Sequence, residues 1–324
     1  MENCPPEILH IIFSYACSDS GATARALSLA SRYISSSASL FLYQSLSLTG
    51  VQNICKLLSS LRNLPDPQRL VYHLFLADNL NDQATTALYH AKSDIPVLGI
   101  QNQALQATEE SPSVIVCIEE LLSLIAPTLR TFTWVISGFV EQQLFNKVFQ
   151  IPFPILTTLT IHLASPRQAY GILLPPRMPR LHRFHISSQG YLSTKVLPVI
   201  APFAEGCPRL SHLRISEARL MPGCPAVLAR LLGRLPLPTT TGFLPSANVI
   251  ESVPRIPFNI RSVVLQMEEG APHYGGGDLV KQMSEMDYKD GFALQATAPR
   301  RTLQEWKNEW AKEAAGDDYF WITG

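Results

Sequence analysis

Residues 179–186 read Pro-Arg-Leu-His-Arg-Phe-His-Ile, and residues 208–215 repeat the pattern as Pro-Arg-Leu-Ser-His-Leu-Arg-Ile. In both stretches Leu stands two residues after the proline, and large apolar residues stand five and seven residues after it. Residues 127–134 and 154–161 follow the same rule, and the four prolines are 27, 25 and 29 residues apart. This even spacing is not an accident of composition, so it indicates a structural repeat.

The core of each repeat predicts a short strand. Its last two apolar residues lie on one face of that strand, and the residues between successive cores return as a helix or loop, as the composition of 117–125 and 196–203 suggests. The period and the core are typical of leucine-rich repeats, in a degenerate form without the asparagine that commonly follows the core. One unit cannot bury its apolar face alone, so neighbours must stack into a solenoid. Weaker copies of the core are Val71/Leu74/Leu76, Leu232/Leu235/Leu237 and Ile260/Val263/Leu265.

Composition places the chain among folded proteins. Its 324 residues include 26 basic and 26 acidic side chains, and 46% are apolar while 16% are charged. These values exclude a disordered tail and a globally basic nucleic-acid binder, and the length predicts about two domains. The first apolar stretch, residues 8–17, has no basic residue before it and is too short to span a bilayer. We therefore expect a cytoplasmic or nuclear protein with no membrane partner.

Cysteine usage favours the same compartments. A disulfide scaffold would be shorter and richer in cysteine, so reduced and buried thiols are expected. No C-x-x-C pair occurs among the six scattered cysteines, which are Cys4, Cys17, Cys55, Cys117, Cys207 and Cys224.

Short helices are expected before the repeats. The first begins at Pro5-Pro6 and has four apolar residues on one face: Ile8, Leu9, Ile12 and Phe13. The second is expected over residues 22–31 with a buried face of Ala26, Leu27, Leu29 and Ala30. A serine-rich third helix follows, and the alternation of residues 45–48 then predicts a half-buried strand.

The same region resembles a known family. Residues 5–15, Pro-Pro-Glu-Ile-Leu-His-Ile-Ile-Phe-Ser-Tyr, resemble the opening of the F-box. The match continues through Leu-Ser-Leu-Ala-Ser-Arg at 27–32 and ends with Leu-Tyr-Gln-Ser-Leu-Ser-Leu at 42–48, an ending typical of fungal F-box-like proteins. Several of those proteins carry degenerate leucine-rich repeats behind the box. The specific part of the resemblance covers residues 4–48, and the rest of the chain matches in architecture only.

The resemblance implies a three-helix unit that binds the Skp-type adaptor of a cullin-based ubiquitin ligase. Two positions depart from the family pattern, since Cys4 stands where Leu is usual and Tyr33-Ile34 replaces a tryptophan-containing segment. Periodicity alone leaves another interpretation open, in which the apolar residues of the first helix are only the core of a helical cap on the solenoid. Carried over by position, the adaptor face would include Pro6, Ile8, Leu9, Ile12, Phe13, Leu27, Leu29 and Arg32.

No enzymatic chemistry or cofactor is expected. The His-Tyr-Gly-Gly-Gly stretch at 273–277 is similar to an esterase oxyanion segment, but the chain has no G-x-S-x-G elbow, so we interpret it as a loop. His182 and His185 are three residues apart within an expected strand, so they face opposite sides and are interpreted as half-exposed repeat residues instead of metal ligands. A hydrolase is carried only as a third hypothesis.

One charge asymmetry stands out. Residues 167–234 contain ten basic residues against two acidic ones, a local net charge of +8 (10 − 2). Such a stretch is a solvated basic flank or a surface for an acidic ligand. Nucleic acid is not an expected partner because no recognised binding motif accompanies the stretch.

Together these observations predict an α/β fold in three parts. Residues 1–48 form an F-box-like domain, 49–270 a degenerate leucine-rich-repeat-like solenoid with a parallel sheet, and 271–324 a C-terminal loop and helical cap. In the cap, a helix with Leu303, Trp306 and Trp310 is expected to close an open solenoid end. The expected function is a substrate receptor of an SCF-type ubiquitin ligase, with a Skp-type adaptor, a cullin and a target protein as partners. The alternative is a repeat scaffold that assembles no ligase.

Overall fold

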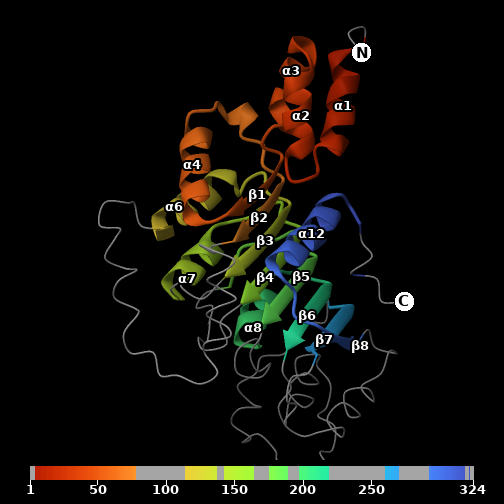
Figure 1. The fold of residues 1–324 in the computed structure, drawn as a ribbon. Helices are drawn as coiled ribbons and strands as arrows, with labels where there is room; N and C mark the ends of the chain where they lie inside the picture. Colours follow the sequence, from red (N-terminus) through yellow and green to blue (C-terminus); the bar gives the residue numbers. More distant parts are fainter. Residues whose placement is uncertain are drawn as a thin grey trace, which may run out of the picture.

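Eight parallel strands in the described part of the chain form one sheet and lie side by side in chain order (Figure 1). This computed structural model describes residues 4–77, 114–136, 142–163, 175–188, 197–218, 260–269, 292–317 and 321. The predicted α/β fold with a parallel sheet is therefore confirmed. The strands are β1 (Ser45–Thr49), β2 (His73–Ala77), β3 (Thr131–Ile136), β4 (Thr158–Leu163), β5 (Arg183–Ser188), β6 (His212–Ala218), β7 (Ser262–Glu268) and β8 (Phe292–Ala298).

The repeat cores found in the sequence lie in register across the sheet. Phe132 of β3 pairs with Leu159 of β4, Leu159 with Phe184 of β5, and Phe184 with Leu213 of β6. Two of the weaker copies extend this row through β2 and β7, whereas the copy at 232–237 lies outside the described residues. The prediction that these cores form neighbouring strands of one sheet is confirmed.

Helices between consecutive strands cover the face of the sheet on which the repeat cores point (Figure 1). Parallel neighbours need such crossovers, because the chain must return to the same end of the sheet before the next strand begins. Short 3₁₀ turns, Ser39–Phe41 and Asp66–Gln68, flank β1 and its following helix. The crossover helices are α4 (Val51–Arg62), α6 (Val114–Ile125), α7 (Gln142–Gln150) and α8 (Leu197–Gly206).

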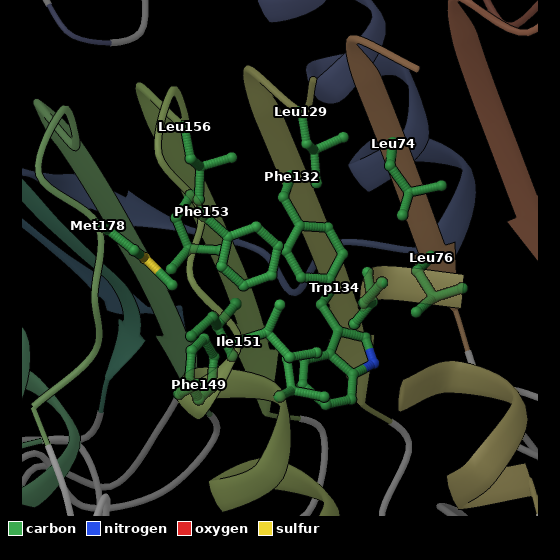
Figure 2. Packing of buried hydrophobic residues seen from close by; sticks show 14 of the residues in the cluster. Leu74, Leu76, Leu129, Phe132, Trp134, Phe149, Ile151, Phe153, Leu156 and Met178 are labelled. Atoms are coloured by element: carbon green, nitrogen blue, oxygen red, sulfur yellow. The ribbon is translucent and has the colours of Figure 1, made fainter. Parts of the chain in front are cut away.

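Aromatic rings fill the space between this helical layer and the sheet (Figure 2). The Phe132 ring stacks on those of Trp134 and Phe153, with centroids 6.1 and 6.3 Å apart. Phe184 stacks on Phe203 of α8 at 4.2 Å, and all five side chains are buried. Because burial of one such side chain contributes roughly 1.5–3 kcal/mol, this layer contributes strongly to stability.

Helix α12 (Leu303–Ala314) covers the opposite face of the sheet (Figure 1). Its side chains Trp306 and Trp310 are buried in a cluster with Phe75 of β2 and Val135 of β3, and the Trp310 and Phe75 ring centroids are 5.8 Å apart. The prediction that this helix closes an end of the sheet is wrong. Apolar side chains on the second face of β2 and β3 need cover, and α12 provides it.

Three short helices precede the sheet and lie beyond β1 (Figure 1). They share a hydrophobic cluster that is separate from the core of the sheet. The Gln44 side chain donates a hydrogen bond to the carbonyl of Ser14 (2.7 Å), and the Ser45 hydroxyl donates one to the carbonyl of Ser18 (3.1 Å). These bonds attach the helices to the start of β1. The helices are α1 (Pro6–Ala16), α2 (Ala22–Ala30) and α3 (Arg32–Ala38).

The sheet extends past both expected domain boundaries. A boundary after residue 48 falls inside β1, and the segment expected as a C-terminal cap supplies β8. Parallel pairing of β1 with β2 and of β8 with β7 places both strands in the same sheet as the repeats. The stretch at 236–257, whose threonines and prolines predict an exposed loop, and the glycine run at 275–277 lie outside the described residues.

Candidate protein-docking surface

Helix α1 carries apolar side chains on two of its sides. Leu9 and Phe13, followed by Cys17 at the helix end, are spaced four residues apart and therefore lie on one face. All three are buried, and they pack in a cluster that includes Ala24 of α2 and Ile34 of α3. We call Leu9, Phe13 and Cys17 the inner stripe; it builds the small core that holds the three helices together.

Polar side chains at the helix starts hold α2 and α3 in place around this core. The Asp19 carboxylate accepts hydrogen bonds from the backbone N–H of Thr23 (3.0 Å) and from its hydroxyl (2.8 Å). The Ser31 hydroxyl accepts one from the N–H of Ile34 (3.2 Å) at the start of α3. Such caps satisfy N–H groups that have no partner within the helix. Gly21 turns the chain into α2 with φ of 84°, a conformation that glycine adopts without strain.

The other apolar side of α1 faces solvent. Ile8, Ile11, Ile12 and Tyr15 are 47%, 57%, 50% and 79% exposed, and their spacing of three, four and seven residues defines one continuous face. We call these four residues the outer stripe. Leu29 of α2 is 86% exposed as well. A row of large apolar side chains left in water is an indicator of a protein–protein contact.

The predicted adaptor face is therefore divided between the interior and the surface. Leu9 and Phe13 were expected to contact a partner, but they are buried in the helices' own cluster and cannot. Leu27 is half-buried against the same cluster. The residues that the structure leaves exposed are Pro6, Ile8, Ile12, Leu29 and Arg32.

Sequence reasoning missed half of the outer stripe. Ile11 and Tyr15 continue the exposed face of Ile8 and Ile12, and an i, i+3, i+4, i+7 count would have found them. The prediction of a buried face on α2 is also wrong in part. Leu29, and with it Ala26 and Ala30, is exposed, because α2 contributes mainly Ala24 and Leu27 to the core.

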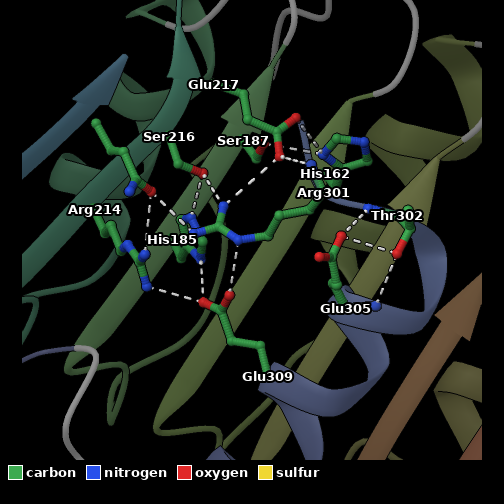
Figure 3. A network of polar contacts seen from close by, with 11 residues as sticks. His162, His185, Ser187, Arg214, Ser216, Glu217, Arg301, Thr302, Glu305 and Glu309 are labelled. Atoms are coloured by element: carbon green, nitrogen blue, oxygen red, sulfur yellow. Dashed lines mark hydrogen bonds and ion pairs between the residues drawn. The ribbon is translucent and has the colours of Figure 1, made fainter. Parts of the chain in front are cut away.

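The second face of the sheet meets α12 through a buried polar network (Figure 3). Glu309 of α12 accepts a hydrogen bond from Arg214 Nη1 (2.9 Å) and pairs with Arg301 Nε (3.1 Å). Arg301 also donates from its backbone N–H to Glu217 Oε1 (3.2 Å) and from Nη1 to Ser216 Oγ (3.2 Å). Together with the tryptophans, these contacts hold α12 on the sheet, so the sheet is closed to a partner where α12 lies.

Two histidines in this network are held as neutral rings. Burial lowers the pKa of His162 to about 3 and that of His185 well below its usual range, and the positive charge of Arg301 acts in the same direction. The His162 ring is hydrogen-bonded to Ser187 (3.0 Å) instead of being charged. The prediction that His185 is half-exposed is wrong because α12 covers it, whereas His182 is exposed before β5.

Ser216, His185 and Glu309 have the outline of a hydrolase triad. Ser216 Oγ lies 2.8 Å from His185 Nε2, but His185 Nδ1 is 3.8 Å from Glu309 Oε1, which is too long for a hydrogen bond. The serine hydroxyl is buried beneath α12, and the glutamate is bound to Arg214. A substrate has no route to the hydroxyl, so we assign these residues to the contact between α12 and the sheet.

Arginines of the basic stretch lie both inside and on the surface of the sheet region. Arg214 lies buried beneath α12, whereas Arg180 and Arg209 are exposed just before β5 and β6. Backbone hydrogen bonds place the residues that precede these strands side by side. They border a depression of about 260 Å³ that is lined by Thr157, Thr158, His182, Arg183, Ser211 and His212.

In the ranges that the structure describes, no helix is long and apolar enough to cross a membrane. The same residues contain no group of three or more His, Cys, Asp or Glu side chains placed to hold a metal ion. The chain matches no family model, and no curated protein matches it in sequence. Its function is therefore inferred from its own residues.

Proposed function

We propose that this protein is a substrate receptor of an SCF-type ubiquitin ligase, in which an F-box-like unit binds a Skp-type adaptor and a leucine-rich-repeat-like solenoid binds a target protein. The observation that carries the proposal is the exposure of the outer stripe of α1 on the helix where the F-box resemblance begins. In this assignment α1–α3 are the F-box-like unit, and the strands β1–β8 with their crossover helices are the solenoid. The cullin is reached through the adaptor.

The outer stripe has the spacing of a helix that lies against another helix or in a groove. Full burial of an isoleucine contributes roughly 1.5–3 kcal/mol, so covering three isoleucines that are about half exposed contributes roughly 1 kcal/mol each. Tyr15 adds a large ring with a polar tip, a residue type that is enriched at interfaces. Pro6, Leu29 and Arg32 are exposed as well and extend the surface available to the adaptor.

The inner stripe supports this contact without touching the partner. Leu9 and Phe13 pack α1 against the other two helices, so the outer stripe is presented on a rigid element. A unit of about 45 residues is near the lower size limit for independent folding. Adaptor binding would therefore also stabilise the three helices.

Target binding is assigned to surfaces that α12 leaves free. The second face of β2 and β3 is covered, so the residues at the start of β4–β6 are the more accessible candidate surface. The arginines and histidines there favour an acidic target segment.

The receptor performs no bond chemistry. It raises the effective concentration of a target lysine beside the ubiquitin-conjugating enzyme, which can lower the apparent barrier by several kcal/mol.

The test is co-purification of the full chain with a Skp-type adaptor. Ile12→Asp places a charge at the centre of the outer stripe and is expected to weaken adaptor binding more than about tenfold. The matched control is Val116→Asp on α6, because Val116 is also an exposed aliphatic residue (43%) but lies far from α1 in the chain. Circular dichroism and the unfolding midpoint of each variant establish that both are folded.

Equal adaptor binding by wild type, Ile12→Asp and Val116→Asp would remove the outer stripe from the interface. No adaptor binding by the wild-type chain, with other stable partners recovered from the native cell by affinity purification and mass spectrometry, would favour the scaffold without a ligase. Labelling of the folded chain by a serine- or cysteine-hydrolase probe, lost on one substitution, would instead revive a hydrolase.

A further inference from the structure

Two cysteines that are 62 residues apart meet between α4 and α6. The sulfur atoms of Cys55 and Cys117 lie 2.7 Å apart. Non-bonded carbon atoms rest about 3.5–4.0 Å apart, and sulfur is larger than carbon, whereas a disulfide bond joins its sulfurs at about 2.0 Å. The two thiols are therefore in contact, and an approach of about 0.7 Å (2.7 − 2.0) would bring the sulfurs to bonding distance.

The helices that carry this pair are held rigidly. Ile54 and Leu58 of α4 and Ile118 and Leu121 of α6 are all buried in the core of the sheet. An ion pair between Arg62 and Glu120 also joins the two helices. The two sulfurs thus meet because of the packing of the fold and not because of a flexible segment.

The two thiols differ in accessibility. Cys55 is partly exposed, whereas Cys117 is buried. The other described cysteines are elsewhere, with Cys4 and Cys17 in the cluster of the N-terminal helices and Cys207 beside α8. A partly exposed thiol in contact with a buried one resembles the pairing of an attacking and a resolving cysteine.

We propose that Cys55 and Cys117 are a reversible disulfide site that reacts with a small disulfide such as oxidised glutathione. The Cys55 thiolate attacks one sulfur of the small disulfide, forms a mixed disulfide and releases one glutathione thiolate. The Cys117 thiol gives up its proton to solvent and attacks Cys55 Sγ, which forms the Cys55–Cys117 bond and releases the second glutathione. The two protein thiols are oxidised, and one glutathione disulfide is reduced to two thiols.

The second step is expected to depend strongly on pH. In the reduced pair, burial and then the hydrogen bond with Cys55 raise the pKa of the Cys117 thiol to about 11. The burial remains once Cys55 has formed the mixed disulfide, so the pKa of Cys117 stays raised in the second step. Only the thiolate attacks a disulfide. Ring closure should therefore become faster as the pH rises from 7 to 9, because the thiolate fraction of Cys117 rises with pH.

The experiment treats the full folded chain with excess oxidised glutathione and then alkylates the remaining thiols with iodoacetamide. Peptide mapping under non-reducing conditions is expected to yield a linked pair of peptides that contain Cys55 and Cys117, and dithiothreitol should separate them. Cys117→Ser should stop at glutathionylated Cys55, and Cys55→Ser should form no link. Cys207→Ser is the matched control, because it removes another buried thiol of the sheet region and should leave the link intact.

Three results would overturn the proposal. In the first, the wild-type chain stops at the Cys55–glutathione adduct at pH 9. In the second, neither thiol of the folded wild-type chain reacts, although the urea-unfolded chain is oxidised. In the third, Cys55 or Cys117 is linked to a different cysteine. Since all variants replace sulfur by oxygen, the unfolding midpoint of each reports whether it is folded. The outcome is independent of adaptor binding, so failure here leaves the proposed ligase function untouched.

Discussion

Helices α1 and α12 both carry large apolar side chains, but the described part of the protein buries the largest ones of α12 and leaves half of those of α1 exposed. The tryptophans of α12 are buried against β2 and β3, and Arg214 and Arg301 bind its glutamate. The inner stripe of α1 is buried in the same way, whereas its outer stripe is not covered by any described part of the chain. Helical periodicity therefore locates an apolar stripe but does not identify the surface that covers it.

Substitutions on α12 and on the outer stripe of α1 should change the free energy of unfolding by very different amounts. Trp310→Ala should lower the free energy of unfolding by about 3–5 kcal/mol, because it leaves a cavity over Phe75. Tyr15→Ala on the outer stripe should change it by less than about 0.5 kcal/mol. Urea unfolding of both variants makes the comparison, and a large loss for Tyr15→Ala would show that the protein itself covers the outer stripe.

Within α1, substitutions in the inner and outer stripes should differ in the same way. Leu9→Ala should lower the free energy of unfolding of the N-terminal helices by about 2–5 kcal/mol, since Leu9 is buried in their cluster. Ile8→Ala, one residue earlier, should cost much less stability and instead weaken adaptor binding. Hydrogen exchange of residues 6–38 reports local stability in each variant. If both substitutions destabilise these helices equally, the division into two stripes is wrong.

The third effect concerns pH and the contact of α12 with the sheet. Burial raises the pKa of Glu217 to about 7, although Arg301 and Arg300 act against the rise. A carboxyl group whose pKa is higher in the folded state costs stability when it ionises, so this cost is absent below pH 4.5 and complete above pH 7. Glu217→Gln removes the ionisation. Its free energy of unfolding relative to wild type should therefore rise between pH 5 and pH 8, and a constant difference would contradict the assignment.

Much of the sheet could be predicted from the sequence, because equivalent positions in successive repeat cores predict which residues of neighbouring strands pair. Equivalent positions in the repeat pair directly across the sheet, and they are occupied by Phe132, Leu159, Phe184 and Leu213.

The location of α12 was not predicted, although residues 73–77 gave a signal. Parallel strands that are buried on both faces read as nearly continuous apolar runs, and the Leu-Phe-Leu-Ala run of β2 required a second cover.

The candidate site was predicted in part. Ile8 and Ile12 were found because the resemblance and the helical period both include them, and the structure leaves both exposed. Leu9 and Phe13 were assigned to the same face because residues next to each other on a helix were counted as one stripe. The contact of Cys55 with Cys117 could not be predicted, since it depends on how α4 and α6 pack across the sheet.

Hydrogen–deuterium exchange of the full chain, with and without a purified Skp-type adaptor, distinguishes a docking surface on α1 from one elsewhere in the chain. We predict that the adaptor slows exchange in α1 and leaves α12 unchanged, because α12 is already covered by the sheet. The Ile12→Asp variant should lose this protection. Protection that appears only outside residues 6–16, or no protection in the presence of saturating adaptor, would contradict the assignment of the outer stripe as the docking surface.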